Sequence, residues 1–309
     1  MRLYAATGDA VARVDDGDVT LSLQGSGAQC IAADGDRAFV GTFDNGILRT
    51  LDGGATWRDV TDGIPHKRVL SVSISPHGAV YAGTEPSSLF RSTDGGATWE
   101  DLAALRDVPS YDTWFFPPRP ETHHVRWIAP HADDADAIHV GIELGGVLRT
   151  RDGGTTFEDR HPDAVIDPHV VHAHPRATDR IYAIGGDGVS FSLDSGDSWS
   201  RDTDGMDRFY TWGLAVDPGD PDTWYVSAAP DPFHAHGEGD AEGRLFRRRR
   251  ATSWEPLGPV QADMPYALAS PEPDTLVVGM RSGKIRVCTG EDWRTLDAKL
   301  PGILQLAVA

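Results

Sequence analysis

Side chains able to bind or transform a polar ligand are concentrated in the middle of the chain, in segments that lie between the copies of an internal sequence repeat. The longest segment, about residues 103–124, contains SYDTWFFPPRPETHH, and shorter ones are 161–169, 203–212 and 228–243. Connections longer than about a dozen residues tend to be functional. Aromatic rings and arginines around a concavity suit a sugar ring or an anionic small molecule.

We therefore predict a binding site for a small polar or anionic ligand within these segments. Its candidate residues are Trp114, Arg119, His123, His124, Arg126, His169, His172, Arg208, Tyr210 and Trp212. The alternative interpretation is that the aromatic rings form the small core that a long loop needs, and that the histidines are incidental.

Two carboxylates in the same region are candidates for acid–base catalysis. Glu143, in GIELGG, is the candidate acid and Asp167 its candidate partner. Glycoside hydrolysis needs one protonated carboxyl group and one carboxylate that activates water. Tyr210 or Tyr111 close to Glu143 would instead indicate covalent catalysis. In the alternative interpretation Glu143 is a solvated turn residue.

Histidine pairs separated by one residue indicate a candidate metal site. His172 forms one pair with His174, and His234 forms another with His236. Side chains two positions apart on a strand point to the same side. With Glu143 nearby, neutral imidazoles could hold zinc or another divalent ion for a metal-dependent hydrolase or lyase. Against this, His174 precedes a proline and the second pair lies in a Gly-rich segment. The sequence does not identify a cofactor.

The overall composition is strongly acidic and poor in lysine. The 309 residues carry a net charge of −19, only three lysines are present, and aspartate outnumbers glutamate by more than three to one. Such a surface repels itself at low ionic strength, and concentrated salt screens that repulsion. The composition resembles that of proteins from extremely salt-loving archaea. The alternative is an ordinary acidic protein from a GC-rich genome.

The charge and hydropathy exclude several classes of partner. A surface of this sign argues against binding to nucleic acid or anionic membranes. We interpret the one basic run, Arg247–Arg250, as an exposed sheet edge. No stretch is apolar enough to cross a bilayer, and MRLYAATGDA does not read as a signal peptide. Cys30 and Cys288 have no metal-binding or redox spacing, so we expect reduced structural thiols in a cytoplasmic protein.

The elements that must position these residues come from an internal repeat. Four good copies are LRTLDGGATWRDV (48–60), LFRSTDGGATWEDL (89–102), VLRTRDGGTTFEDR (147–160) and VSFSLDSGDSWSRD (189–202), and weaker copies occupy 245–257 and 284–296. Asp52, Asp94, Asp152 and Asp194 can accept backbone N–H groups in a tight turn. The glycines permit positive φ, and the following aromatic ring is expected to pack on the sheet of its own repeat.

This motif resembles the Asp-box, or BNR repeat, of sialidases, xyloglucanases, sortilin-type receptors and the plant photosystem II stability/assembly factor. The resemblance implies an all-β propeller in which the boxes are structural and lie on the face away from the ligand site. For a sialidase it also implies a catalytic tyrosine–glutamate pair, an aspartate acid/base, three arginines and an Arg-Ile-Pro segment. That tripeptide is absent, and the N-terminal repeat has only Arg2 and Arg13. A typical sialidase is therefore not expected.

Upstream strands such as VLSVSISPHGAVYAGT (69–84) complete each repeat to about four strands. We predict one domain, 1–309, forming a seven-bladed β-propeller. Its blades are 303–309 with 1–25, then 29–60, 69–102, 125–160, 169–202, 212–257 and 265–296. The C-terminal strand, 303–309, is expected to pair with the N-terminal blade and close the ring, which removes two exposed edges.

The inserted segments then fall on blades four to six. Loops between blades, and between second and third strands, share one face, so we expect the ligand site there. The loops equivalent to that of Glu143 in the two preceding blades carry Glu85 and Asp44. The favoured function is a ligand-binding or assembly protein. Its candidate partners are a small polar or anionic ligand, with carbohydrates among the candidates, or another protein. The alternatives are a glycoside hydrolase or lyase using Glu143 with Asp167, and the histidine-cluster metal enzyme.

Overall fold

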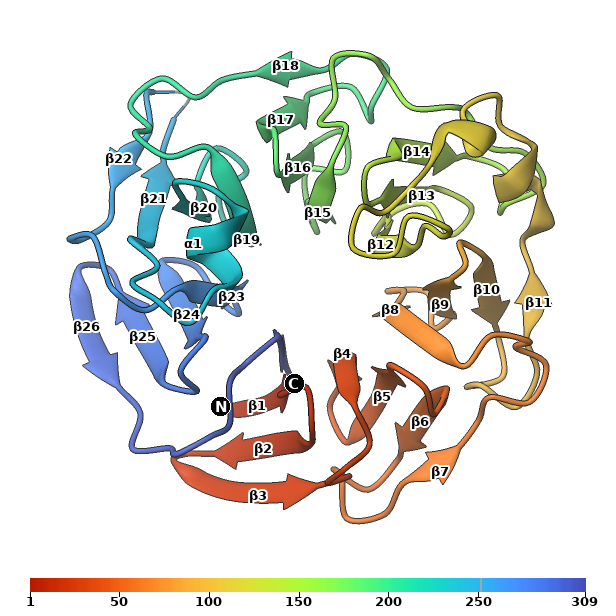
Figure 1. The fold of residues 1–309 in the computed structure, drawn as a ribbon, viewed down its shortest axis with the longest axis horizontal. Coiled ribbons are helices and arrows are strands. Elements are labelled where there is room, and N and C mark those ends of the chain that lie inside the picture. The colour runs from red at the N-terminus through yellow and green to blue at the C-terminus, as the bar shows by residue number, and fades with distance from the viewer. Residues whose placement is uncertain (251) are drawn as a thin grey trace.

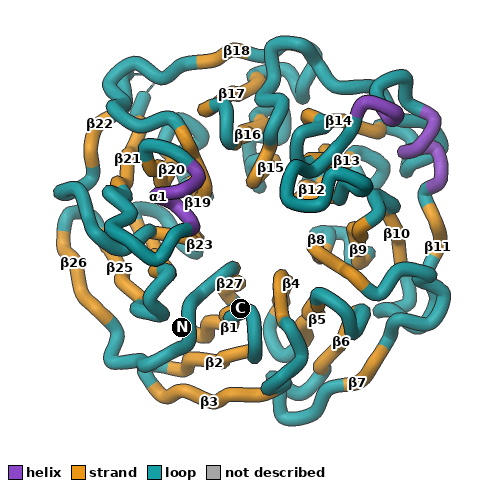
Figure 2. Tube along the Cα trace, in the orientation of Figure 1, coloured by secondary structure: helices purple, strands orange, loops and turns teal. Residues whose placement is uncertain are grey.

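Seven small antiparallel sheets follow one another around a common centre in the computed structural model, which describes residues 1–250 and 252–309 (Figures 1 and 2). The fold is a seven-bladed β-propeller, as the repeat predicts. Each sheet is one blade, and its first strand lies innermost. The first three blades contain the following strands. Blade one has β27 (Gln305–Val308), β1 (Arg2–Ala6), β2 (Val11–Asp15) and β3 (Asp18–Ser22); blade two has β4 (Ala28–Asp34), β5 (Arg37–Thr42), β6 (Ile47–Thr50) and β7 (Arg58–Asp59); blade three has β8 (Arg68–Ile74), β9 (Val80–Glu85), β10 (Leu89–Ser92) and β11 (Glu100–Asp101).

The remaining four blades complete the ring in chain order. Blade four has β12 (Val125–Pro130), β13 (Ile138–Ile142) and β14 (Gly146–Thr150); blade five has β15 (Pro168–Ala173), β16 (Ile181–Gly185), β17 (Gly188–Ser192) and β18 (Ser200–Arg201); blade six has β19 (Tyr210–Val216), β20 (Trp224–Ala229), β21 (Arg244–Arg248) and β22 (Glu255–Pro256); blade seven has β23 (Pro265–Ala269), β24 (Thr275–Met280), β25 (Ile285–Thr289) and β26 (Asp292–Thr295). In blade four an isolated bridge between Arg149 and Glu158 stands where a fourth strand would lie.

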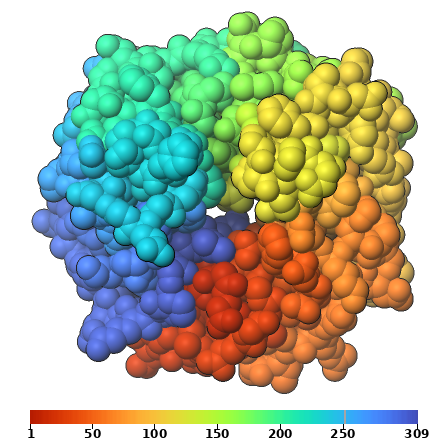
Figure 3. Space-filling view, in the orientation of Figure 1, coloured from red at the N-terminus to blue at the C-terminus, as the bar shows by residue number. Residues whose placement is uncertain are grey.

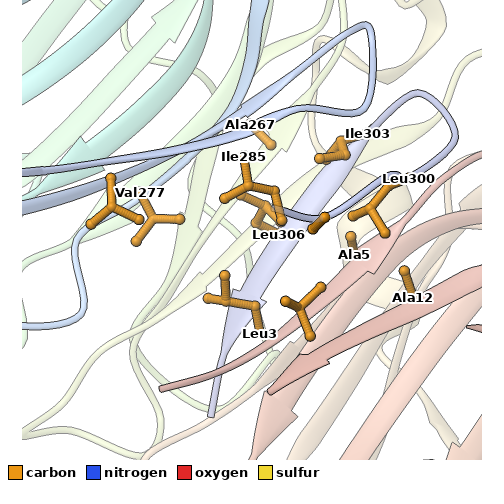
Figure 4. Close-up of a cluster of buried hydrophobic side chains, with 12 residues drawn as sticks. Leu3, Ala5, Ala12, Ala267, Val277, Ile285, Leu300, Ile303 and Leu306 are labelled. Carbon is orange, nitrogen blue, oxygen red and sulfur yellow. The ribbon is translucent and has the colours of Figure 1, made fainter. Parts of the chain in front are cut away.

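The two ends of the chain meet in blade one and close the ring. β27 pairs antiparallel with β1, with Leu3 opposite Val308 and Ala6 opposite Gln305, which confirms the predicted closure. Apolar side chains of this shared blade, such as Leu3 and Leu306, pack in one cluster with side chains of blade seven, such as Ile285 (Figure 4). Because β27 pairs with it, β1 has a hydrogen-bonded neighbour on each side and is not left as an exposed edge.

Each good repeat forms a hydrogen-bonded turn between its third and fourth strands. Asp52 Oδ1 accepts the backbone N–H of Thr56 at 2.8 Å, and Thr50 Oγ1 donates to the same oxygen at 2.7 Å. Gly53 and Gly54 adopt φ of 71° and 89°, conformations that favour glycine. Asp94, Asp152 and Asp194 accept the equivalent N–H groups at 2.8–2.9 Å.

Arginines and aromatic rings of the repeat connect one blade to another. Arg13, Arg49, Arg91 and Arg149, all on third strands, donate to a carbonyl in the turn of the following blade, at 2.6–3.0 Å. The box tryptophans reach the other way: Trp57 Nε1 donates to Ser22 Oγ and Trp99 Nε1 to the Val60 carbonyl, both in the preceding blade. The rings pack with apolar side chains of their own blade, as expected, and also with those of the preceding blade, so they lie at the seam between two blades.

The basic run also departs from expectation. Arg247 and Arg248 lie on β21 and are only 9% and 7% exposed. Arg247 Nη1 lies 2.9 Å from Glu291 Oε1, and Arg248 Nη2 lies 2.7 Å from Asp202 Oδ2. These two arginines are not on an exposed edge, because each guanidinium is neutralised by an acid of a neighbouring blade while its stem packs on apolar surface. Arg249 is partly exposed and Arg250 is exposed, as predicted for the run. Within the described residues, no helix has the length and apolar character needed to span a bilayer.

Candidate functional site

One residue from almost every innermost strand is directed towards the centre of the ring by a β-bulge. The register shifts lie between Ala28 and Cys30, Val69 and Ser71, Val125 and Trp127, Pro168 and Val170, Thr211 and Leu214, and Pro265 and Ala267. A bulge inserts an extra residue and re-aims its side chain. The residues at these shifts include Gln29, Leu70, Arg126, His169, Trp212 and Tyr266.

Two adjoining cavities lie inside this ring of bulged residues. Their volumes are about 340 and 250 Å³, and they share the walls Arg126, Trp127, Trp212, Tyr266, Leu304 and Gln305. The space-filling view shows a hollow at the middle of this face, bordered by the yellow segment around residues 110–124 and the cyan segment around 232–240 (Figure 3). The inserted segments therefore flank the cavities, as expected for a ligand site.

Glu143 lies at the wall of the smaller cavity, directly after β13. Its side chain is 13% exposed, and its Oε2 lies 2.9 Å from His124 Nε2 and 3.4 Å from Arg126 Nε. Within the described residues its other oxygen, Oε1, receives no hydrogen bond. Burial raises the pKa of Glu143, but the hydrogen bond from His124 and the nearby positive charge of Arg126 outweigh this and lower the pKa to about 2. Glu143 is therefore an ionised group with one free oxygen.

Asp167 and His169 lie against Glu143. One donor atom from each of the three residues lies within 4.8 Å of the other two. Asp167 Oδ1 accepts the Leu144 backbone N–H at 3.2 Å, and Asp167 Oδ2 is 3.7 Å from His169 Nε2. Burial and the negative charge of Glu143 raise the pKa of Asp167 to about 7. The predicted carboxylate pair is thus brought together, and its two members differ in protonation near neutral pH.

A missing side chain in blade five leaves space for Asp167. The second strands end in VYAGTE (80–85), IHVGIE (138–143) and IYAIGG (181–186), so Gly186 stands where the neighbouring blades have Glu85 and Glu143. A Cβ at Gly186 would lie 2.2 Å from Asp167 Oδ2. The carboxylate of Asp167 therefore lies where the side chain of a glutamate at position 186 would begin.

His169 is held in one tautomer at the bulge of β15. Its Nδ1 lies 2.7 Å from the Thr211 carbonyl oxygen, which can only accept, so Nδ1 carries the proton. Nε2 is then an unprotonated acceptor, it is buried, and it has no hydrogen-bond partner. The side chain is 1% exposed, and burial lowers its pKa to about 4. His169 thus presents a neutral imidazole nitrogen towards the two carboxylates.

Aromatic side chains form the wall beside this cluster. Trp212 lies 4.5 Å from the His169 ring and has the Arg126 guanidinium 4.9 Å above it. His236 bridges two tyrosines, with its Nε2 2.8 Å from the Tyr210 hydroxyl and its Nδ1 2.7 Å from the Tyr266 hydroxyl. Burial raises the pKa of Tyr266 to about 12, so this tyrosine stays protonated. The wall offers rings for stacking and hydroxyls for hydrogen bonding.

A second buried carboxylate, Glu85, lies in the adjacent blade. Arg119 donates to both of its oxygens, through Nε at 2.6 Å and Nη2 at 2.5 Å, and Arg68 Nη1 donates to Oε1 at 2.7 Å. His124 Nδ1 is 3.8 Å away. The predicted residues Arg119 and His124 thus lie at the smaller cavity, but Arg119 is occupied by a carboxylate of the protein itself.

Other predicted residues lie apart from the cluster. Trp114 is 5% exposed and packs edge-on against His123, with ring centroids 5.5 Å apart, so both stabilise the inserted loop. That loop contains two 3₁₀ turns, η1 (Ala103–Asp107) and η2 (Tyr111–Thr113), and Tyr111 packs on Trp114. Arg208 donates to the Glu242 carbonyl. For these residues the structure matches the alternative interpretation, a loop with its own small core.

The histidines proposed for metal binding do not assemble. His234 and His236 lie on a short helix, α1 (Pro232–His236), where residues two apart point in nearly opposite directions. His234 pairs with Asp231, and His172 lines the larger cavity beside Trp127. Among the described residues, Glu143, Asp167 and His169 are the one trio of potential ligands brought close together. Tyr266, Gln29 and Leu70 also line the cavities but were not among the predicted site residues. Each occupies the same position near the start of a first strand, and this shared position could have indicated them.

No family model matches the sequence, and no curated protein matches it by sequence. Several solved propellers are similar in structure. A GH74 enzyme from Niastella koreensis has a TM-score of 0.67 at 15% identity, over 99% of this chain and 52% of that one. A catalytically inactive virginiamycin B lyase from Staphylococcus aureus, solved with quinupristin, has a TM-score of 0.67 at 15% identity, over 91% and 88% of the two chains. YCF48 bound to a D1 peptide has a TM-score of 0.61 at 16% identity, over 89% and 84%.

These similarities establish the propeller fold alone, because all the identities are low. The chain spans 38–52% of the length of the GH74 chains that it matches. The similar structures include two enzyme classes and a peptide-bound protein, so the fold does not select a function.

Proposed function

We propose that this protein binds a small anionic ligand in the central cavities and acts on it as a hydrolase or a lyase. The observation that carries the proposal is the convergence of Glu143, Asp167 and His169 beside a cavity on the face with the inserted loops. Three groups able to exchange protons or bind an ion, gathered from blades four and five, form the kind of site that catalysis uses.

The charge of the cavity walls supports an anionic ligand. The charged residues lining the two cavities are Arg119, Arg126 and Glu143, and Arg119 is already paired with the buried Glu85. In the larger cavity Arg126 is the one charged residue among the described lining residues. The whole chain carries −19. A cavity lined by an arginine and by no acid, in a strongly negative protein, favours anions there while the rest of the surface repels them.

The shape and composition of the cavities support a ligand of small size with an apolar part. Each cavity is close to the lower end of the range for small-molecule sites, about 300–1,000 Å³. Trp127, Trp212 and Tyr266 line both hollows and offer flat surfaces for a ring. The ligand is therefore expected to combine an acidic group with a ring or an aliphatic segment.

The spacing of the carboxylates narrows the reaction class. Inverting glycosidases place their carboxyl groups about 6.5–9.5 Å apart to admit a water molecule. Glu143 and Asp167 present oxygens within 4.8 Å of each other. This spacing disfavours the inverting mechanism, and it favours a shared role of the two carboxylates at one reacting atom or one bound ion.

A ligand screen tests the proposal. Thermal unfolding would be followed in multimolar KCl with sugar acids, oligosaccharides, phosphate esters and dicarboxylates, for wild type, Glu143→Gln and the control Glu85→Gln. We expect one acidic class to stabilise wild type and the control but not Glu143→Gln, and that class would then be assayed for turnover. If no compound stabilises wild type, the proposal is wrong.

A protein partner is the second candidate function. Phe115, Phe209 and Phe233 are 46%, 51% and 85% exposed, and all lie on the inserted segments around the cavities. Exposed aromatic side chains gathered on one face are typical of a binding surface. A protein partner for this face would lose affinity when the three phenylalanines are changed to serine, whereas small-anion binding in the cavity would remain.

We also propose that the protein works in the cytoplasm of a cell that holds concentrated salt. The charge of −19 supports this, as do two buried cysteines that form no disulfide within the described residues. Screening of surface repulsion should raise the midpoint of thermal unfolding between low salt and multimolar KCl. Equal midpoints would contradict the proposal.

A further inference from the structure

The hydrogen bonding of His169 is typical of a histidine that binds a metal ion. Histidine ligands usually donate their second ring nitrogen to a carbonyl or carboxylate, which fixes the tautomer and aims the free nitrogen. Here Nδ1 donates to the Thr211 carbonyl at 2.7 Å, and the side chain is 1% exposed. Nε2 finds no hydrogen-bond partner within the described residues, although a buried polar atom normally has one.

The atoms that Nε2 faces are carboxylate oxygens. Asp167 Oδ2 lies 3.7 Å away, beyond hydrogen-bonding distance, and a Glu143 oxygen completes a trio within 4.8 Å. Two carboxylates so close together repel each other, so that either one of them takes up a proton or a positive charge lies between or beside them. Arg126, at 3.4 Å from Glu143, supplies only one such charge, and its guanidinium is directed to Glu143 and Trp212 rather than to Asp167.

We propose that Glu143, Asp167 and His169 bind one divalent transition-metal ion, Mn²⁺ or Zn²⁺. Imidazole nitrogen suits zinc and carboxylate oxygen suits manganese, so one nitrogen with two oxygens fits this pair better than Ca²⁺. Metal–ligand bonds of about 2.1 Å place neighbouring donor atoms roughly 3.0–3.5 Å apart. The Asp167–His169 pair, at 3.7 Å, is already near that separation, and the Glu143 oxygen would have to move closer from a distance within 4.8 Å.

A bound ion would take part in the proposed hydrolase or lyase reaction, and this catalytic role of the metal rests on the proposed function. A three-ligand site leaves coordination positions open for water or substrate. Glu143 lines the smaller cavity, so an ion beside it faces the anionic ligand and adds positive charge there. Bound in this position, the metal would polarise a carbonyl or phosphoryl oxygen of the ligand or activate a water molecule.

Binding of Mn²⁺ alone tests the site without knowledge of the substrate. The full chain would be stripped with EDTA, dialysed into metal-free buffer with multimolar KCl to suppress weak binding by surface carboxylates, and titrated with MnCl₂ while free Mn²⁺ is followed by electron paramagnetic resonance. Zn²⁺ would be measured by competition. We expect one tightly bound ion per chain in wild type.

The variants assign the ion to the three residues. Asp167→Asn and His169→Gln should each weaken Mn²⁺ binding at least about tenfold, because removal of even an outer-shell partner costs that much. Glu85→Gln removes a more deeply buried carboxylate one blade away and should leave Mn²⁺ affinity unchanged. If His169→Gln fails to fold, Asp167→Asn and Glu143→Gln carry the test. A wild type that retains no ion, or an Asp167→Asn variant that binds as wild type does, would overturn the proposal.

Failure of the metal site and failure of the proposed function give different results. Repeating the anion screen in EDTA separates them. Anions that bind equally well with and without Mn²⁺ would refute the ion's role while leaving the proposed ligand site intact. One Mn²⁺ per chain that is lost in Asp167→Asn, with no anion bound under any condition, would support the metal site and refute the proposed function.

Discussion

Glu85 and Glu143 occupy the same position in neighbouring blades, at the end of the second strand, yet their surroundings differ. Both oxygens of Glu85 are taken by arginines, Arg119 and Arg68, and its side chain is 2% exposed. Glu143 uses one oxygen for His124 and Arg126 and leaves the other free beside a cavity. A saturated buried carboxylate stabilises the structure, whereas one with a free oxygen can bind a ligand or an ion.

The difference arises from residues outside the repeat. Arg119 comes from the inserted loop of blade four and neutralises the glutamate of blade three. No inserted arginine reaches Glu143 among the described residues; Asp167 reaches it instead, through the space that Gly186 leaves. The inserted loop therefore supplies the arginine that neutralises Glu85. At Glu143, the small size of Gly186 lets a second carboxyl group, that of Asp167, come close.

Glu85→Gln should give the largest effect on stability. Breaking a buried ion pair by removing one partner leaves uncompensated charge, here on two arginines, and costs about 3 kcal/mol. Denaturant-induced unfolding followed by tryptophan fluorescence would measure this as a lower midpoint. A loss below about 1 kcal/mol would mean that solvent, which reaches both guanidinium groups, already compensates them.

His124 connects the two sites, and its loss should be intermediate. Its Nε2 lies 2.9 Å from Glu143 Oε2, and its Nδ1 lies 3.8 Å from Glu85 Oε2. His124→Ala removes a buried hydrogen bond to a charged group and should cost about 2 kcal/mol in unfolding free energy. It should also weaken Mn²⁺ binding about tenfold, because the orientation of Glu143 is lost. Unchanged Mn²⁺ affinity would show that His124 belongs to the Glu85 site alone.

Glu143→Gln should change stability by less than about 1 kcal/mol. The amide oxygen can still accept from His124, and the loss of one negative charge relieves the repulsion of Asp167. Anion and Mn²⁺ binding should be lost in the same variant. A destabilisation as large as that of Glu85→Gln would remove the distinction between a structural and a functional glutamate.

Lower pH should abolish the stability difference between wild type and Glu85→Gln. Burial raises the pKa of Glu85, but the hydrogen bonds from Arg119 and Arg68 outweigh it, so the folded-state pKa lies below the ordinary 4.5. A group with a depressed folded-state pKa stabilises the protein above its unfolded-state value, and that contribution is lost as the pH falls through the folded-state pKa. The two denaturation midpoints should therefore be separate at pH 7 and converge below pH 4.5. Parallel curves across this range would contradict the assignment.

The strand content of a blade, the number of blades and the closure of the ring could all be predicted from the sequence. Those features repeat or are local: Asp-Gly-Gly turns, strands that alternate in hydrophobicity, and a C-terminal strand, Gln305–Val308, that supplies the first strand which the N-terminal segment of blade one lacks. The sequence also placed the inserted segments on one face, because loop positions within a blade follow from strand order.

Only the tertiary structure decided which side chains meet. Asp167 reaches Glu143 because Gly186 is small, and His169 is positioned by a bulge and by the Thr211 carbonyl of the next blade. Each of these depends on contacts between residues distant in the chain or on a bulge that no residue type announces. The repeat fixes where a strand lies, but the direction of its central side chain depends on the neighbouring blade.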